Sequence, residues 1–245
     1  MLLKRILIVD TYYPEFVRTL YAQRPELQTL PYQAQLTAFI QQRFGTSDYY
    51  SRHLTALGYD TQDVLANNTI VQWQWAKEHH ITVHHWPNLP YINRLTNRLL
   101  LYKILRAQIA EFRPDILYMQ NLSFCDPLTL HSLKKHISLL IGQIASPLPP
   151  TPFIKPYDLI LTSFPHFVER IRALGPDSEY LKIGFDESIL TALQPVSDKI
   201  YDVVFIGGFT QVHSAATQAL ETLAKHVRVD VWGYGIEHLA ADSPL

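Results

Sequence analysis

The sequence predicts an α/β fold: a parallel sheet flanked by helices, followed by the start of a second sheet near the C-terminus. Short apolar runs alternate with amphipathic stretches, which is the pattern of strands joined by crossover helices. Three runs, at 113–118, 157–162 and 201–206, place an Asp just before a continuous apolar segment. Continuous apolar strands are typical of sheets covered on both faces, so the sheet is expected to be parallel.

The elements follow from this alternation and from their end signals. Strands are predicted at 5–10, 61–66, 115–121, 137–145, 157–163, 179–184, 201–207 and 228–233. Helices are predicted at 31–44, 47–57, 70–79, 91–112, 127–135, 165–174 and 214–225. Pro165 suits the first turn of its helix, and Gly58 and Gly175 fall where helices should end.

The composition is that of a folded protein. Of the 245 residues, 47% are apolar and 18% charged, which argues against disorder. Lys and Arg total 21 against 22 for Asp and Glu, so no net charge attracts a polyanion, and nucleic acid is not an expected partner. A single cysteine, Cys125, and an N-terminus that leads straight into a strand predict a cytoplasmic protein. No run approaches the ~20 apolar residues of a membrane-spanning helix.

A polar, proline-bearing stretch at 194–199 predicts the boundary between a domain at 1–193 and an incomplete one at 200–245. The second part opens with a strand that runs into Gly207 and Gly208, then His213 and a helix. A strand, a glycine turn and a helix N-terminus form a phosphate cradle, because unpaired N–H groups point at the anion. The pair lacks the full glycine spacing of a dinucleotide motif, so the motif alone is weak. An unpaired hydrophobic sheet face is expected in this second part.

Several segments together carry a resemblance to a known family. They are 6–14, 142–150, 157–167, 201–209 and 231–235. They resemble a glycosyltransferase of the GT-B fold, closest to the group related to spore maturation protein CgeB and the group 1 glycosyltransferases. The resemblance implies a Rossmann-like acceptor-binding domain, then a Rossmann-like domain that holds a nucleotide-diphospho-sugar, with no metal and no other cofactor. The family's donor-gripping carboxylates would fall after Leu245, so the chain is expected to be a fragment with negligible transfer activity of its own.

The resemblance and the sheet geometry place the site outside the carboxyl ends of the strands. The catalytic candidates are Asp10 and His166. Acceptor-binding candidates are Thr11, Tyr12, Tyr13, Gln120, Asn121, Gln143 and Ser163, and candidates for the donor diphosphate are Gly207, Gly208 and His213. Amides that read hydroxyls, aromatic surfaces and groups that help a departing diphosphate all suit sugar transfer. An inverting transferase needs a base, Asp10 or His166, beside the acceptor hydroxyl, whereas a retaining one need not.

Structural alternatives stand beside each assignment. Asp10 and His166 could cap a helix or anchor a loop. Tyr12 and Tyr13 could pack a loop onto the sheet, and the amides Gln120 and Gln143 could satisfy buried backbone groups.

Two wider alternatives also remain. Arg94, Arg98 and Arg106 share one helix face, which fits either a solvated crossover helix or peripheral contact with anionic lipid. The rival to a transferase is a non-catalytic acceptor-binding or partner-binding module. A phosphorylation receiver domain does not fit, because Thr11 and Gln120 stand where it needs acidic residues.

Overall fold

The computed structural model describes residues 4–82, 90–193, 198–210 and 214–245, with the side chains of 90–96 left out. The chain divides into two compact units, Met1–Phe185 (unit 1) and Asp186–Leu245 (unit 2), and each is treated by itself. The boundary predicted at 194–199 falls mostly on residues outside this description.

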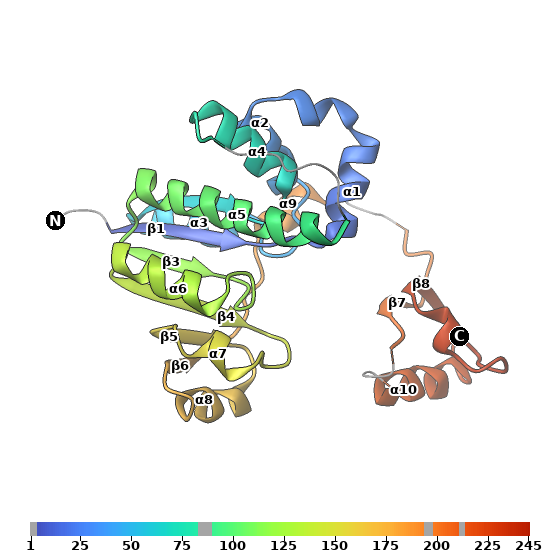
Figure 1. The fold of residues 1–245 in the computed structure, drawn as a ribbon. Helices are drawn as coiled ribbons and strands as arrows, with labels where there is room; N and C mark the ends of the chain where they lie inside the picture. Colours follow the sequence, from blue (N-terminus) through green and yellow to red (C-terminus); the bar gives the residue numbers. More distant parts are fainter. Residues whose placement is uncertain (1–3, 83–89, 194–197, 211–213) are drawn as a thin grey trace. The chain divides into compact units, whose positions relative to one another are not determined.

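Unit 1 is built on a six-stranded parallel sheet in the order β2-β1-β3-β4-β5-β6 (Figure 1). Its strands are β1 (Arg5–Asp10), β2 (Asp60–Leu65), β3 (Ile116–Met119), β4 (Leu139–Ile144), β5 (Leu159–Thr162) and β6 (Asp177–Tyr180). This arrangement confirms the predicted fold class, a Rossmann-like parallel sheet flanked by helices. The chain leaves β1 for β2 at one edge and returns to β3 on the other side of β1, so the topological switch point lies between β1 and β3.

The Asp residues that precede the apolar runs have a defined structural role. The carboxylate of Asp115 accepts a hydrogen bond from the backbone N–H of Arg5 at 2.9 Å, and that of Asp158 accepts one from Leu140 at 2.8 Å. Each Asp therefore satisfies a backbone donor at the start of the neighbouring strand, where the ladder has no partner to offer.

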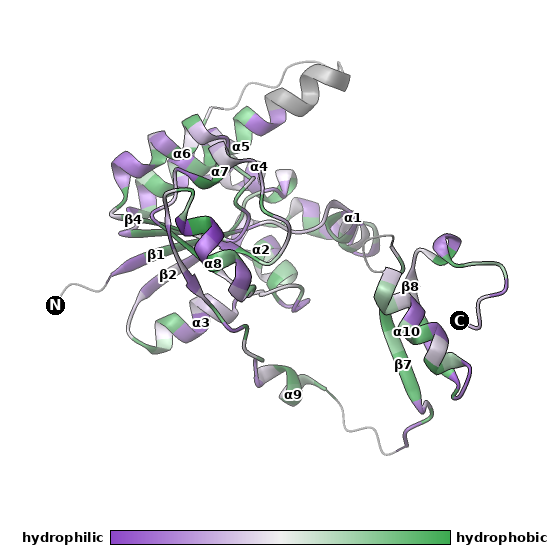
Figure 2. Cartoon of the chain, turned by 90° about the horizontal axis from the view of Figure 1, so that it is seen from below, coloured by the Kyte–Doolittle hydropathy of each residue, from purple (hydrophilic) through white to green (hydrophobic). Residues whose placement is uncertain are grey.

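Helices cover the two faces of this sheet unequally. They are α1 (Pro14–Gln23), η1 (Pro25–Thr29), α2 (Tyr32–Ile40), α3 (Tyr49–Ala56), α4 (Thr69–Glu78), α5 (Pro90–Phe112), α6 (Pro127–Leu133), η2 (Lys134–His136), α7 (Thr151–Ile154) and α8 (Pro165–Arg172). Leu7, Leu117 and Leu140 pack against α5, α6, α7 and α8, whereas Ile8 and Tyr118 face α3. Figure 2 shows α5 and α6 on one side of the sheet and α3 on the other.

A further hydrophobic core is built from residues of α1, η1, α2 and α4, and Phe39 is fully buried in it. The sequence reading missed α1, η1 and α7, which are short or lack clear periodicity. The two predicted glycine ends are confirmed, since Gly58 and Gly175 have φ angles of 90° and 124° just after α3 and α8.

Unit 2 carries its own two-stranded parallel sheet, β7 (Val203–Gly208) and β8 (Val229–Tyr234), joined by α10 (Ser214–Ala224). The short α9 (Ser188–Ala192) precedes this sheet and η4 (Ile236–His238) follows it. One face of the sheet leaves apolar side chains in solvent: Val204, Ile206, Trp232 and Tyr234, with Ile206 79% exposed. This face is the unpaired hydrophobic surface expected from the sequence, and it is called the open face below.

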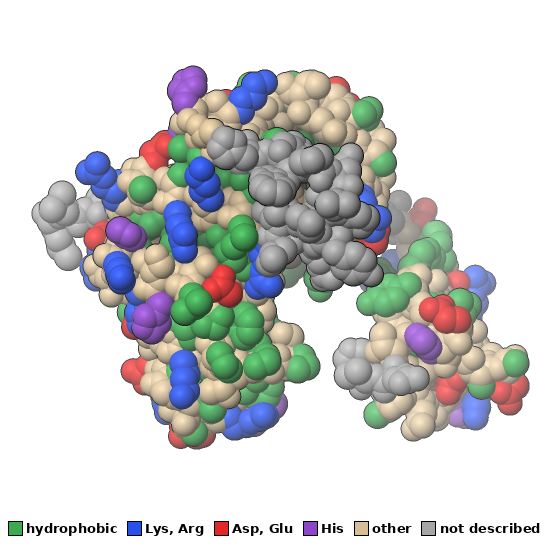
Figure 3. Space-filling view, in the orientation of Figure 1, with side chains coloured by type: hydrophobic (Ala, Val, Ile, Leu, Met, Phe, Trp, Pro, Cys, Tyr) green, Lys and Arg blue, Asp and Glu red, His purple; other side chains and the backbone are tan. Residues whose placement is uncertain are grey.

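Charge is dispersed over the visible surface. On the side shown in Figure 3, the Lys and Arg side chains of unit 1 lie apart from one another among apolar and acidic groups. Among the described residues, no helix combines the length and apolar character needed to cross a membrane.

Candidate functional site

The switch point gathers polar side chains from three segments of unit 1. Asp10 ends β1, and Gln120 and Asn121 follow β3. The Asn121 amide donates to the Thr11 hydroxyl oxygen at 3.0 Å. The Thr46 hydroxyl, between α2 and α3, donates to the Gln120 amide oxygen at 2.6 Å. These five residues are called the switch-point cluster, and the structure thus brings together four of the predicted site residues.

The Asp10 carboxyl is held in an environment that favours its neutral form. Burial raises its pKa from 3.8 to about 6, although the Thr11 backbone N–H donates to it at 2.7 Å and partly opposes the rise. A carboxyl with a pKa close to neutrality is suited to accept and release a proton at physiological pH.

A second carboxyl with the same property lies on the same sheet face. Asp63 in β2 pairs with Ile8, and Asp10 pairs with Leu65, so the two acidic side chains are diagonal neighbours. Burial raises the pKa of Asp63 to about 6, the Ser51 hydroxyl that donates to it lowers the pKa, and the charges of Asp48 and Asp10 raise it. The sequence reading missed Asp63, because an Asp inside a short strand looks like an ordinary surface residue.

The loop at 43–48 brings Thr46 to the cluster with a strained backbone. Arg43 and Ser47 have φ angles of 53° and 48°, in the left-handed region that residues other than glycine disfavour. Gly45 between them has a φ of 61°, which glycine adopts without strain. Ser47 is buried, and its hydroxyl donates to the carbonyl of Ile40 at 2.7 Å. Strain of this kind is often found at functional sites. The sequence reading missed this loop, although glycine and hydroxyl residues between two helical segments were a usable signal.

Two glutamine side chains, Gln120 of the cluster and Gln143, differ in their hydrogen bonding. Gln143 accepts a hydrogen bond from the Tyr118 hydroxyl, whose ring meets that of Tyr50 edge-on at 5.4 Å. The amide nitrogen of Gln120 is buried and has no hydrogen-bond partner among the described residues.

The two tyrosines after β1 divide between packing and exposure. Tyr12 is only 4% exposed, and its ring meets Phe39 and Phe44 edge-on. Its backbone N–H and C=O are both bound by the Asn67 amide, at 2.9 and 2.7 Å. Tyr12 therefore packs the loop, the structural alternative given above, whereas Tyr13 is 72% exposed.

Ser163 and His166 lie apart from Asp10. They follow β5, three strands from β1 in the sheet, which corresponds to about 14 Å. His166 is exposed and stacks on Phe164, with ring centroids 5.7 Å apart. Asp10 and His166 are thus separate candidates, because they cannot both reach one hydroxyl in this arrangement.

In unit 2 the predicted phosphate cradle is described only in part. Gly207 and Gly208 lie inside β7 rather than in the turn after it, and His213 lies outside the described residues. A Cβ on Gly207 would lie 2.8 Å from the Phe205 ring, so this glycine makes room for a side chain of its own strand. A cavity of about 250 Å³ is nevertheless present here, lined by Phe209, Thr210, Ser214, Thr217, Gln218, Glu221, His238, Leu239 and Ala240.

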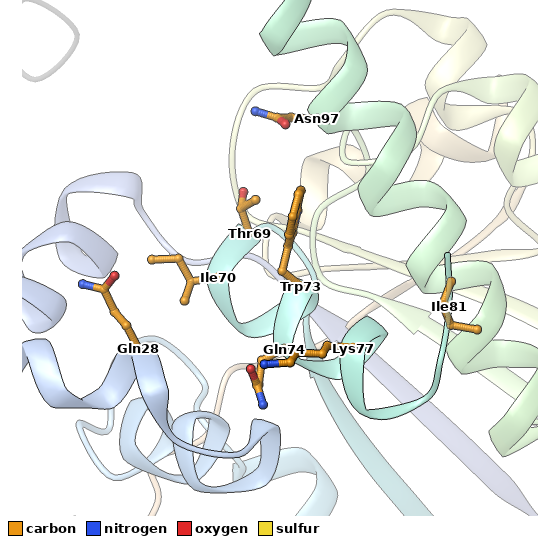
Figure 4. Close-up of a pocket in the computed structure, with 8 residues that line it drawn as sticks. All are labelled: Gln28, Thr69, Ile70, Trp73, Gln74, Lys77, Ile81 and Asn97. Atoms are coloured by element: carbon orange, nitrogen blue, oxygen red, sulfur yellow. The ribbon is translucent and has the colours of Figure 1, made fainter. Parts of the chain in front are cut away.

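A larger cavity of about 610 Å³ opens between η1, α4 and α5 (Figure 4). It is lined by Gln28, Thr69, Ile70, Trp73, Gln74, Lys77, Ile81 and Asn97. None of these residues was a predicted site residue.

One arginine of the predicted helix face, Arg98, has local partners. The Arg98 guanidinium lies over the Tyr102 ring at 5.5 Å and donates to the carbonyls of Ser123 and Phe124, both at 3.4 Å. Arg106 is exposed, and the side chain of Arg94 lies outside the described residues, so lipid contact stays a prediction.

Cys125 is fully buried, and burial raises the pKa of its thiol to about 12, which makes it a poor nucleophile. Within the described ranges, no group of three or more His, Cys, Asp or Glu residues is placed to hold a metal ion.

Comparison with known proteins gives a likeness to solved structures. No family model and no curated protein matches the sequence. A solved structure from Listeria monocytogenes, assigned as a UDP-N-acetylglucosamine 2-epimerase, is similar with a TM-score of 0.46 and 11% sequence identity. The match covers 95% of this chain and 62% of that one, so the chain spans less than two thirds of its neighbour. At this level the likeness carries no information about activity.

Proposed function

We propose that the chain belongs to a protein that transfers a sugar from a nucleotide-diphospho-sugar to an acceptor hydroxyl, with unit 1 binding the acceptor. The observation that carries the proposal is Asp10, a carboxyl with a pKa of about 6 set among hydroxyl and amide groups at the switch point. Ligands of open parallel sheets bind at this position. The amide nitrogens of Gln120 and Asn121 and the hydroxyl of Thr11 are groups that read sugar hydroxyls.

In the proposed reaction, the ionised Asp10 accepts the proton of the acceptor hydroxyl. The hydroxyl oxygen then attacks the anomeric carbon of the donor, and the bond between that carbon and the diphosphate oxygen breaks. The electron pair leaves with the diphosphate, and Asp10 releases its proton to water. The donor diphosphate would bind in unit 2, near Gly207 and Gly208 at the end of β7.

The rival is a sugar-binding module without turnover. It draws support from the small size of the unit 2 sheet, which has two strands in the described residues. The two functions share the acceptor site in unit 1 and differ only in chemistry.

The test measures binding and turnover separately. The full chain is titrated with a panel of methyl glycosides by saturation-transfer NMR, and nucleotide release is then measured with UDP-glucose, UDP-N-acetylglucosamine and GDP-mannose. We expect at least one glycoside to bind and Asp10→Asn to weaken it about tenfold, the loss of a hydrogen bond to a charged group. Asp177→Asn, an exposed strand carboxyl, is the matched control and should leave binding unchanged.

Nucleotide release that depends on both glycoside and Asp10 establishes the transferase. Glycoside binding without release supports the acceptor site in unit 1, which both functions share. If no glycoside binds, or if Asp10→Asn binds as the wild type does, the acceptor site in unit 1 is refuted.

A further inference from the structure

The solvent face of α5 carries positive charge without an acidic residue to balance it. One stripe of exposed residues, spaced by four, three, four and three positions, runs along the helix to its end: Leu99, Lys103, Arg106, Ala110 and Arg113. The stripe is about 21 Å long. The acidic residue of α5, Glu111, lies 3.3 Å from the Nε2 of His79 at the end of α4. Glu111 therefore belongs to the side of α5 that meets α4, and the stripe itself is basic.

The exposed face of α6 continues this surface. Leu128, His131 and Lys135 are exposed and lie three and four residues apart along α6 and η2. Asp126, just before α6, is engaged within the fold, since its carboxylate accepts from the Thr129 backbone N–H at 3.0 Å. Because α5 and α6 cover the same side of the sheet, their solvent faces look out on that side (Figure 2). Together they are called the basic face, made of Leu99, Lys103, Arg106, Arg113, Leu128 and Lys135.

Exposed leucines lie at one end of the basic face. Leu128 is 84% exposed and Leu99 is 58% exposed. The guanidinium of Arg98, next to Leu99, donates to the carbonyl of Phe124, which precedes Leu128 by four residues, so both leucines lie near this contact. Since α6 follows β3, this end of the face lies at the carboxyl end of that strand. Figure 3 shows apolar side chains gathered on the same side of unit 1, beside α7 and the loop after β4.

The combination of cations and exposed leucines suits the surface of an anionic bilayer. Each Lys or Arg near such a surface strengthens binding about fivefold, and apolar side chains gain by entering the boundary between headgroups and acyl chains. A nucleic acid would be attracted by the same cations, but it offers no apolar region to Leu99 and Leu128. The whole chain has 21 basic and 22 acidic residues, so the positive charge of this face is a local feature.

We propose that unit 1 docks on an anionic lipid bilayer through the basic face. Leu99 and Leu128 enter the headgroup boundary, and the cations of α5 and α6 lie against the lipid phosphates and carboxylates. The leucine end of the face is also the end of the sheet at which the switch-point cluster lies. The docking does not depend on the proposed sugar transfer.

The test is co-sedimentation of the full chain with two sets of vesicles. One set is phosphatidylcholine alone, and the other is equal parts of phosphatidylcholine and phosphatidylserine. We expect binding to the anionic set only, weakened by added salt. The double variant Arg106→Gln with Lys135→Gln removes one exposed cation from α5 and one from η2, and it should weaken this binding about thirtyfold.

Two further variants separate the basic face from the rest of the surface. Leu128→Gln changes an exposed side chain and should weaken vesicle binding by up to about tenfold, because a leucine no longer leaves water. The matched control is Arg18→Gln with Arg24→Gln, which removes the same charge from α1 and from the residue before η1. Each of these arginines pairs with a glutamate, so the control should change binding by no more than about threefold.

The outcomes against the proposal are distinct. Equal binding to both sets of vesicles, or binding to neither, overturns it. Equal weakening by the two double variants also overturns it, because the effect would then follow total charge and not the basic face. Binding to a single-stranded oligonucleotide without binding to vesicles would assign the face to nucleic acid instead. Asp10→Asn should bind vesicles as the wild type does, which keeps this test separate from that of the sugar site.

Discussion

Replacing Asp10 by Asn should stabilise unit 1 at neutral pH. Burial raises the pKa of Asp10 from 3.8 to about 6, which means that the folded state disfavours the ionised carboxylate. Asn has the same shape, carries no charge and keeps an oxygen that accepts from the Thr11 N–H, a bond of 2.7 Å. The variant therefore removes an electrostatic penalty and leaves the local geometry in place.

The size and pH dependence of this effect follow from the pKa. A shift from 3.8 to about 6 corresponds to at most about 3 kcal/mol against the ionised folded state. This shift already includes the Thr11 hydrogen bond to the ionised carboxylate, so Asp10→Asn should raise the free energy of unfolding by at most about 3 kcal/mol at neutral pH. Below the unfolded-state pKa both states hold the proton and the penalty is absent. As the pH rises toward the folded-state pKa, the folded state retains the proton that the unfolded state has lost, so wild-type stability falls and then levels off above about pH 7.

The assay is urea denaturation followed by tryptophan fluorescence between about pH 4 and pH 8, the window in which this carboxyl titrates. A Trp232→Phe background removes the tryptophan of unit 2, so the signal reports unit 1 alone. Asp177→Asn, at an exposed strand start, should change stability by no more than about 0.5 kcal/mol at any pH. If Asp10→Asn is no more stable than the wild type at neutral pH, burial does not disfavour the ionised Asp10 carboxylate. The argument that Asp10 has a pKa suited to a general base is then refuted as well.

Three further predictions concern other features. Asp63→Asn should give a similar gain in the free energy of unfolding at neutral pH. The double variant with Asp10→Asn should gain less than the sum of the two, since the charge of Asp10 itself raises the pKa of Asp63. Strictly additive gains in the same assay would contradict this coupling. Gly142→Ala should lower the unfolding free energy by about 1–3 kcal/mol, because its Cβ would lie 2.9 Å from the buried Tyr157 ring; unchanged urea midpoints would show that the site can relax. Ile206→Lys on the open face should reduce self-association in sedimentation velocity, and a wild type that stays monomeric at every concentration would argue against an exposed sticky surface.

The strands of unit 1 were readable from the sequence because each is a local pattern. The Asp before β3 and the Asp before β5 marked the point where a loop enters a buried strand, and they satisfy backbone donors there. Helix α1 was missed because Pro14 follows two tyrosines that suggested a loop, and only packing of Tyr12 and Phe39 shows that the chain turns into a helix.

The candidate site was only partly readable. Asp10, Gln120 and Asn121 could be predicted, since the ends of adjacent parallel strands meet at one edge of the sheet. Thr46 could not, because it reaches Gln120 across 74 positions of sequence. The raised pKa of Asp63 depends on burial beneath α3, a tertiary property with no local signature.

The switch-point cluster draws its residues from distant parts of the sequence, which affects how it forms during folding and how a bound ligand would stabilise unit 1. Its members come from positions 10, 11, 46, 120 and 121, and β1 pairs with a strand that begins 55 residues later. A partly folded form of unit 1 contains the cluster only if β1, the loop at 43–48 and the end of β3 are all in place. A small molecule bound there would protect amide hydrogens across the whole of unit 1 from exchange, rather than those of one segment.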